Sequence, residues 1–467
     1  MNKKMRDWLI IVVIFLIAWF CPVPEGLTWG SWHIFSVFIA TIIGFILQPI
    51  PMGAMAFLGI AVAGMTKVLS AKVILGGFGS TTLWLIICAF FFAKGFEKTG
   101  LGRRIAFVVI RAFGKKSLSL AYSIGLASLI LGPAIPSNTA RAGGVLFPVI
   151  KSLSEAYDSQ PGPTAKRLGS FLMSVTFQID AVVSAMFLTS MAANPLIADF
   201  AQKTLGITIS WGGWIEATIV PGLCALIVVV LATYLINRPE IKATPKAPEL
   251  ARQELEAMGK MSRHEWIMLF VFVLALVLWI TSGITKFDNT IVAILGIAIL
   301  LVTGVLEWTD ISGHKQAWTT FAWTGFIMLL SAQLNSSGFI KWFAHGIMTH
   351  MAGLPWIVSA FLAMAIYLYS HYGFASMTAH VSAMYVGLIS VAAAAGAPPF
   401  VAAFSVAMAA SLCGVLTHYG TGPAPVYFGA GYVSQGKWWQ IGFVMSVLNI
   451  CIFYFVGLAW WKVLGLW

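Results

Sequence analysis

Charged side chains are scarce in this sequence. Asp, Glu, Lys and Arg make up 9% of the 467 residues, whereas a soluble globular chain carries roughly 25%. So little charge cannot cover a water-exposed surface, which excludes a cytosolic enzyme, a nucleic-acid-binding protein and a disordered chain. Apolar residues reach 59%, which leaves a protein that crosses a membrane several times.

Acidic residues are scarcer than basic residues, with 16 Asp and Glu against 28 Lys and Arg. The net charge of +12 does not indicate nucleic acid, because the basic residues lie in the polar breaks between apolar runs. Basic loops between apolar runs are typical of membrane topology.

Cysteines are also few, and no pair has the spacing of a metal site. We therefore expect free core thiols, no disulfide framework, no metal and no cofactor. The five cysteines are Cys21, Cys88, Cys224, Cys413 and Cys451.

Long apolar runs with short polar breaks predict an all-α membrane protein rather than a barrel of alternating strands. The first run follows a basic start and has no small-residue cleavage site, so we expect an uncleaved first span. Eleven spans are predicted, near 7–20, 32–50, 53–69, 82–96, 170–202, 213–236, 264–283, 288–305, 318–334, 398–430 and 438–464.

Two further apolar stretches, 117–156 and 355–394, are interrupted by GPAIPSNTARAGG and YSHYGFASMTAH. Each half is too short to cross a hydrocarbon layer of ~30 Å at 1.5 Å per residue. We predict two re-entrant helical hairpins, whose non-helical tips line a cavity or are buried in protein.

The distribution of positive charge orients this arrangement. With the N-terminus in the cytoplasm and the C-terminus outside, the cytoplasmic segments hold 21 of the 28 Lys and Arg, as the positive-inside rule requires. The first hairpin then opens from the cytoplasm and the second from the exterior. The predicted cytoplasmic segments are 1–6, 94–116, 151–168, 238–263, 304–317 and 434–438.

An internal repeat organises the chain, with five matches in the same order at nearly constant separation. An odd number of crossings between matching elements makes the repeats inverted. Inverted repeats with broken helices are typical of secondary transporters, whose site lies at the repeat interface. The matches are Leu58–Ala61 with Leu295–Ala298, Trp84 with Trp323, Gly100-Leu101 with Gly338-Phe339, Ser137–Ala140 with Ser376–Ala379, and Pro195 with Pro423.

The hairpin tips carry the chemistry. Ser137, Asn138 and Thr139 offer two hydroxyls and an amide where a half-helix begins, so unpaired backbone N–H groups and the positive end of the helix dipole point into the cavity. Ser376 and Thr378 repeat this arrangement from the other side. Two facing tips suit a substrate with two carboxylates, although Ser and Thr at a helix start also serve as ordinary caps.

These tips, with TSMAANP at 189–195 and THYGTGPAPVYFG at 417–429, resemble the divalent anion/sodium symporter family over nearly the whole chain. The resemblance is nearest to its bacterial exchangers of citrate, succinate, tartrate, 2-oxoglutarate and malate. It implies a homodimer with a scaffold and a mobile transport domain that works like an elevator. It assigns substrate contact to Ser137, Asn138, Thr139, Ser376, Met377 and Thr378, and closure of the site to Asn194, Thr421, Gly422 and Pro423.

Two departures from the sodium-coupled members stand out. Met377 replaces the second tip's Asn and has no carbonyl for a hard cation. Arg141 and His380, 239 positions apart, follow the two tips at equivalent places. We therefore predict that Arg141 and His380 replace the bound cations, which makes a sodium-independent exchanger; the alternative is that they only hold the hairpins by hydrogen bonds.

Asp180 is the only acid clearly inside a predicted span. It could pair with Arg141, relay a proton, or steady the transport domain. An intramembrane enzyme is disfavoured because such an enzyme needs paired acids, a metal cluster or an activated nucleophile.

The chain is thus predicted to be a multi-pass protein of the cytoplasmic membrane that exchanges di- or tricarboxylates, with only substrate, lipid and a second copy as partners. A sodium-coupled dicarboxylate symporter and an anion channel are the alternatives. The predicted domains are 1–112 and 264–350 (scaffold), 113–237 and 351–467 (transport), and the cytoplasmic linker 238–263.

Overall fold

The computed structural model describes residues 2–351 and 354–467, and all regular elements there are helices. The first half contains α1 Lys3–Phe20, α2 Trp29–Leu47, α3 Met52–Met65, α4 Ala71–Gly76, α5 Thr81–Thr99, α6 Leu101–Phe113, α7 Ser117–Leu131, α8 Phe147–Ala156, α9 Gly169–Met186, α10 Ala193–Leu205 and α11 Trp211–Ile236. The linker forms α12 Lys246–Met258.

The second half contains α13 Arg263–Ile280, α14 Ser282–Thr285, α15 Asn289–Val302, α16 Trp308–Ser312, α17 Lys315–Ser336, α18 Phe339–Met351, α19 Trp356–Ser370, α20 Met377–His380, α21 Val386–Ala394, α22 Pro399–Leu412, α23 Ala424–Gly429, α24 Gln435–Cys451 and α25 Gly457–Val463. Short 3-10 turns lie at Gly77–Gly79, Ala165–Arg167, His371–Gly373 and Cys413–Val415, and π-helical turns at Thr139–Leu146, Val381–Tyr385 and Ile452–Val456.

Local caps explain where several helices begin. The Thr28 and Ser210 hydroxyls accept backbone N–H groups of α2 and α11, and Asp288 does the same for α15. Ser262 and Glu265 form a capping box at the start of α13.

Among the described residues, six helical stretches are long and apolar enough to cross a membrane, and a bent pair, Ala71–Gly79 with Thr81–Thr99 at 46°, gives a seventh. Four shorter apolar helices accompany them. Met377–Ala394, predicted as one arm of a re-entrant hairpin, is among the six, so its length alone would allow a full crossing. The count of eleven spans stays a prediction.

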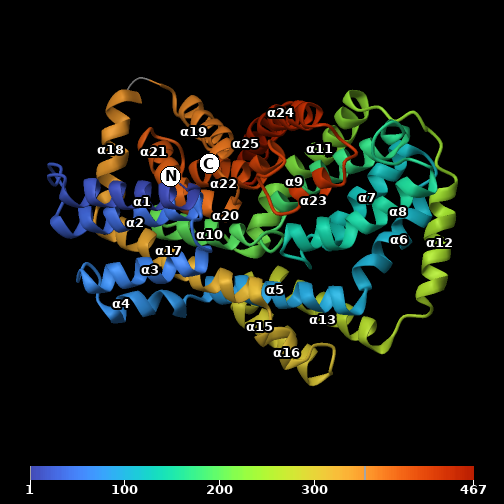
Figure 1. Ribbon diagram of the computed structural model, residues 1–467, viewed down its shortest axis with the longest axis horizontal. Coiled ribbons are helices and arrows are strands. Elements are labelled where there is room, and N and C mark those ends of the chain that lie inside the picture. Colours follow the sequence, from blue (N-terminus) through green and yellow to red (C-terminus); the bar gives the residue numbers. More distant parts are fainter. Residues whose placement is uncertain (1, 352–353) are drawn as a thin grey trace.

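The helices pack in two groups. Helices α1–α5 contact one another and α13–α17. In the second group α9, α10 and α11 contact α21–α25, while α7 and α8 pack on α9 and α19 packs on α21 and α22. The groups meet where α10 contacts α5 and α17 and where α11 contacts α13. Helix α9 is the centre of the second group, since all of its residues except Ala181 are buried. Figure 1 shows α12 along one end of the molecule, packed on α6, and α18 near the opposite end.

Both predicted hairpins have a helix, a non-helical break and a second helix with a π-helical stretch in its first turns; in the second hairpin this stretch follows α20. The first break is shorter than the sequence suggested, because helical structure resumes at Thr139 and includes ARAGG. Predicted spans 170–202 and 398–430 are each interrupted, between α9 and α10 and between α22 and α23. The same order of helices and breaks therefore occurs in both halves of the chain.

Candidate functional site

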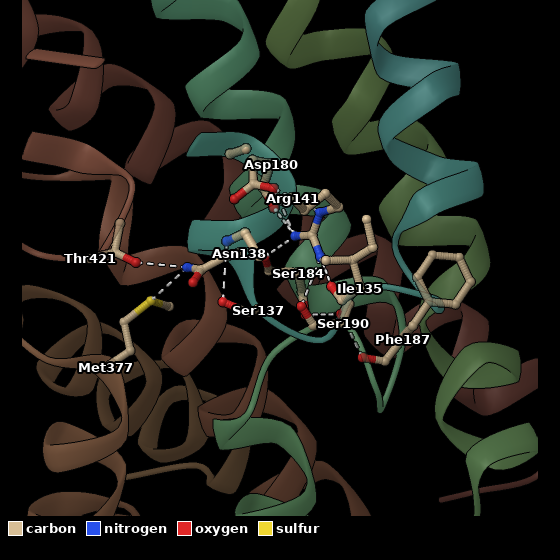
Figure 2. A network of polar contacts seen from close by, with 12 residues as sticks. Ile135, Ser137, Asn138, Arg141, Asp180, Ser184, Phe187, Ser190, Met377 and Thr421 are labelled. Carbon is tan, nitrogen blue, oxygen red and sulfur yellow. Dashed lines mark hydrogen bonds and ion pairs between the residues drawn. The ribbon is translucent and has the colours of Figure 1, made fainter. Parts of the chain in front are cut away.

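Three of the four interruptions meet at Asn138. Its Nδ2 donates a 2.7 Å hydrogen bond to Thr421 Oγ1 in the break between α22 and α23. The same nitrogen lies 3.7 Å from Met377 Sδ, at the second hairpin tip (Figure 2). Residues 239 and 283 positions apart in the sequence are thus brought together.

A cavity of about 460 Å³ lies beside this meeting point. Eight of the ten residues predicted to bind or enclose substrate line it: Ser137, Asn138, Thr139, Ser376, Met377, Thr378, Thr421 and Gly422. Pro136, Ala375, Met191 and Ala192 complete the walls formed by the breaks. Asn194 and Pro423 are not among the lining residues.

The tip serines cap the helices that follow them. Ser137 Oγ accepts the Ala140 N–H at 3.2 Å, and Ser376 Oγ accepts the Ala379 N–H at 3.3 Å. Both serines therefore act as helix caps, as the alternative interpretation of the tips predicted. It does not compete with substrate binding, because each hydroxyl keeps its own proton as a donor.

Close approach of the chain requires glycine at position 422. A Cβ on Gly422 would overlap Thr139 Oγ1, so the break between α22 and α23 lies directly against the first tip.

The opposite wall comes from the first group of helices and was not predicted. It contains Met52, Phe90, Lys315, Gln316, Thr319, Thr320 and Trp323, from α3, α5 and α17. The sequence offered one signal, a Lys-Gln pair just before the predicted span 318–334; Trp323 had been noted only as a repeat match.

Lys315 is the single charged side chain in the lining, which contains no carboxylate among the residues described. It is exposed to the cavity and makes no ion pair within the described part of the chain. A cation in the first turn of a helix also opposes the helix dipole, so this position is electrostatically unfavourable unless an anion is nearby.

Arg141 lies behind the first tip rather than in the cavity, and it is fully buried. Its Nε and Nη2 contact Asp180 Oδ1 at 2.8 Å (Figure 2). Nη1 donates to the carbonyls of Ile135 at 2.9 Å and Ser190 at 2.8 Å, and Nη2 donates to Ser184 Oγ at 2.7 Å. Of the alternatives for Asp180, pairing with Arg141 is the one the structure shows.

This arrangement joins the first hairpin break to the break after α9, through the Ile135 and Ser190 carbonyls. Because the guanidinium faces a carboxylate, the pair carries no net charge. The predicted role of Arg141 as a substitute for a bound cation is not tested by these contacts and stays a prediction.

Asn194 stabilises the break between α9 and α10 by hydrogen bonds. Its Nδ2 donates to the carbonyls of Ser184 at 2.7 Å and Phe187 at 2.9 Å, which are left free where α9 ends. Its Oδ1 accepts from Ser411 Oγ of α22 at 3.1 Å. The structure thus gives Asn194 a framework position, away from the cavity surface.

His380 lies behind the second tip, also fully buried. Its Nδ1 is 3.0 Å from His371 Nδ1, and its Nε2 is 2.9 Å from Ser370 Oγ. His371 Nε2 donates to the Gly420 carbonyl at 2.7 Å, in the break between α22 and α23. The His371–His380 pair therefore joins hairpin to broken helix in the second half, as Arg141 does in the first.

Cys413 joins this pair, since the ligand atoms of His371, His380 and Cys413 lie within 4.8 Å of one another. Such a set could hold a soft metal ion. Sequence spacing did not reveal it, because the three residues come from separate helices.

Spanning helices and a solute-sized polar cavity between broken helices define a multi-pass membrane protein built to bind a small solute. The chain belongs to the sodium:sulfate symporter family, because the family description "Sodium:sulfate symporter transmembrane region" matches residues 2–467. It is accordingly a membrane transporter and not an enzyme, as its resemblance to the divalent anion/sodium symporters predicted.

Curated relatives cover the full chain. YflS of Bacillus subtilis (strain 168), named as a proposed malate transporter, is 49% identical over 99% of this chain and 97% of its own. Dicarboxylate transporter 1 of Arabidopsis thaliana chloroplasts is 46% identical over 97% of this chain and 82% of its own. The citrate/succinate antiporter of Escherichia coli (strain K12) is 35% identical over 100% of this chain and 98% of its own.

A solved structure shares the fold. The YdaH transporter of Alcanivorax borkumensis superimposes with a TM-score of 0.61 over 93% of this chain and 99% of its own, at 12% identity. The chain thus shares the helical fold of that structure.

Proposed function

We propose that this chain exchanges one di- or tricarboxylate for another, such as 2-oxoglutarate, succinate, malate or citrate, across the cytoplasmic membrane. The names of its relatives support this substrate class. The observation that carries the proposal is the cavity itself. Polar, uncharged residues from both tips face a single cation, Lys315, with no carboxylate in the lining described.

Each substrate carboxylate would meet one tip. Ser137 and Thr139 would donate hydroxyl protons to one carboxylate, and Ser376 and Thr378 to the other, while Asn138 offers its amide. An anion loses its hydration when it enters the cavity. Two helix N-termini and Lys315 would supply positive potential in its place.

An elevator movement is supported by where the hydrogen bonds lie. Contacts from Asn138 to Thr421, Arg141 to Ser190, Asn194 to Ser411 and His371 to Gly420 all join elements of the second helix group. That group would move as one body, carrying the tips past the wall formed by α3, α5 and α17. Homodimerisation, the re-entrant hairpins and cytoplasmic N-terminus remain part of this proposal.

Sodium independence is supported by Met377, whose thioether is a poor ligand for a hard cation. Arg141 and His380 lie behind the two tips, at equivalent places, and would stabilise the tips without a metal ion. A sodium-coupled symporter and an anion channel are the alternatives.

Solute counterflow tests the proposal. Purified protein in liposomes would take up labelled succinate or 2-oxoglutarate only when unlabelled dicarboxylate is inside, with or without a Na⁺ gradient. Uptake into empty vesicles driven by Na⁺ would establish the symporter, and non-saturable flux would establish the channel.

A further inference from the structure

A second polar cavity, of about 620 Å³, lies away from the substrate cavity and shares no residue with it. It is formed where the 3-10 turn before α9, the end of α11 and the loop before α24 come together. Its lining consists of Gly162, Ala165, Lys166, Ser170, Ile236, Asn237, Arg238, Gly431, Tyr432, Val433, Ser434 and Lys437.

Three of these residues are cations and none is acidic. Lys166, Arg238 and Lys437 come from three separate parts of the chain, and none forms an ion pair within the described residues. Arg238 lies 5.8 Å from the centre of the Tyr234 ring, and Lys437 Nζ donates to Gln440 at 3.1 Å, so both charges are placed without being neutralised. Three cations without an acid in the lining give the hollow a positive potential, although Glu155 lies near enough to add to the rise that burial causes in the pKa of Tyr432.

The walls of this cavity are held firmly. Tyr432 donates its hydroxyl to the Ser159 carbonyl at 3.1 Å, and its ring lies so close to Gly169 that no Cβ would fit there. Asn237 Nδ2 lies 3.0 Å from Ser170 Oγ and 3.2 Å from Ser174 Oγ. These hydrogen bonds and the close packing of Tyr432 hold together the segments that carry the cations.

The cavity also receives the start of a long helix. Ser434 is the N-cap of the 17-residue helix α24, and its side chain makes no capping hydrogen bond. The first N–H groups of α24 and the Ser434 hydroxyl therefore remain as donors beside the three cations.

We propose that this basic cavity binds a phosphate group, belonging to an anionic membrane lipid or to a small soluble phosphate ester. A phosphate presents several oxygens to converging donors, and a guanidinium such as that of Arg238 binds it in a bidentate manner. All three cations belong to segments predicted to be cytoplasmic, where anionic lipid headgroups and soluble phosphate esters both occur. A phosphate there would fix the ends of α9, α11 and α24 relative to one another.

Two triple variants test this site in the full-length protein. The cavity variant removes all three positive charges from the lining and combines Lys166→Gln, Arg238→Gln and Lys437→Gln. Arg111→Gln with Lys115→Gln and Lys260→Gln removes the same charge from exposed cytoplasmic positions outside the cavity. Thermal unfolding would be followed in phosphatidylcholine nanodiscs with inorganic phosphate or glycerol phosphate added, and in nanodiscs containing phosphatidylglycerol.

We expect wild type and the outer triple variant to gain thermal stability from at least one probe, and the cavity variant to bind that probe at least about tenfold more weakly. A gain from phosphatidylglycerol alone identifies a lipid headgroup, and a gain from the soluble probes identifies a free phosphate. The proposal would be overturned if no probe stabilised the wild type, or if both triple variants lost probe binding to the same extent. Succinate giving the same cavity-dependent gain would also overturn it in favour of a carboxylate site.

Discussion

Asn138 at the first hairpin tip donates a 2.7 Å hydrogen bond to Thr421, which lies in the broken helix of the other half of the chain. Both residues line the cavity of about 460 Å³, so the bond joins the two halves of the chain at the wall of that cavity. If the cavity binds substrate as proposed, Asn138 connects the geometry of the first tip to that binding.

Replacing Asn138 should therefore weaken binding in a graded way. Asn138→Ala removes a polar contact and should raise the dissociation constant for dicarboxylate about tenfold. Asn138→Asp should weaken it further, because it adds negative charge to a site for anions. Equilibrium binding to purified protein measures both. Asn335→Ala is the control, since the Asn335 amide donates to the Lys203 carbonyl away from this cavity; an Asp variant that binds better than the Ala variant would contradict the assignment.

Lys315 should act by charge. Lys315→Gln should raise the KM for a dicarboxylate by roughly tenfold, and Lys315→Glu by more, while Lys315→Arg should keep most of the affinity. The KM of wild type should also rise with ionic strength more steeply than that of Lys315→Gln. Lys286→Gln, an exposed lysine outside the cavity, should leave the KM unchanged. An identical salt dependence in wild type and Lys315→Gln would show that Lys315 does not attract substrate.

The Arg141–Asp180 pair should be a stability element. Arg141→Met or Asp180→Leu alone leaves an unpaired buried charge and should cost about 3–5 kcal/mol of stability. The double variant should regain part of that loss, because neither charge is then left alone. Thermal unfolding of the four proteins in one detergent forms the cycle. A double variant that loses the sum of both single losses would mean that the two side chains are not coupled.

Gly422 should tolerate no side chain while Thr139 is present. Gly422→Ala should lower both thermal stability and transport, because its Cβ would overlap Thr139 Oγ1. Adding Thr139→Ala should restore stability but not transport, since a hydroxyl proposed to bind substrate is then missing. Gly429→Ala, where a Cβ meets nothing within 4 Å, is the control. Full transport by Gly422→Ala would contradict this packing.

Much of the candidate site could be predicted because it lies in helix breaks that are recognisable in the local sequence. Ser137–Thr139 and Ser376–Thr378 follow Pro-, Gly- and Ser-containing interruptions in apolar runs, and such interruptions lie where helices cannot continue. The pairing of Asp180 with Arg141 was also among the stated possibilities, because a lone acid in an apolar run needs a partner.

The other wall could not be predicted from local sequence. Lys315 and Thr319 come from a helix far along the chain, and only packing of the two helix groups places them opposite the tips. Asn194 was predicted to help close the site; the structure shows that it satisfies the carbonyls at the end of α9, a need that arises only once that helix has ended. The meeting of His371, His380 and Cys413 likewise depends on tertiary structure.

The stoichiometry and affinity of dicarboxylate binding test the central claim most directly, that both tips bind one substrate in one cavity. Labelled succinate would be bound at equilibrium to purified wild type, Thr139→Val, Thr378→Val and the double variant, with Thr233→Val, buried outside the cavity, as the control. We predict one succinate per chain, weaker binding in each tip variant, still weaker binding in the double variant, and no change in the control. Two succinates per chain, or unchanged affinity in either tip variant, would contradict a site shared by the two halves.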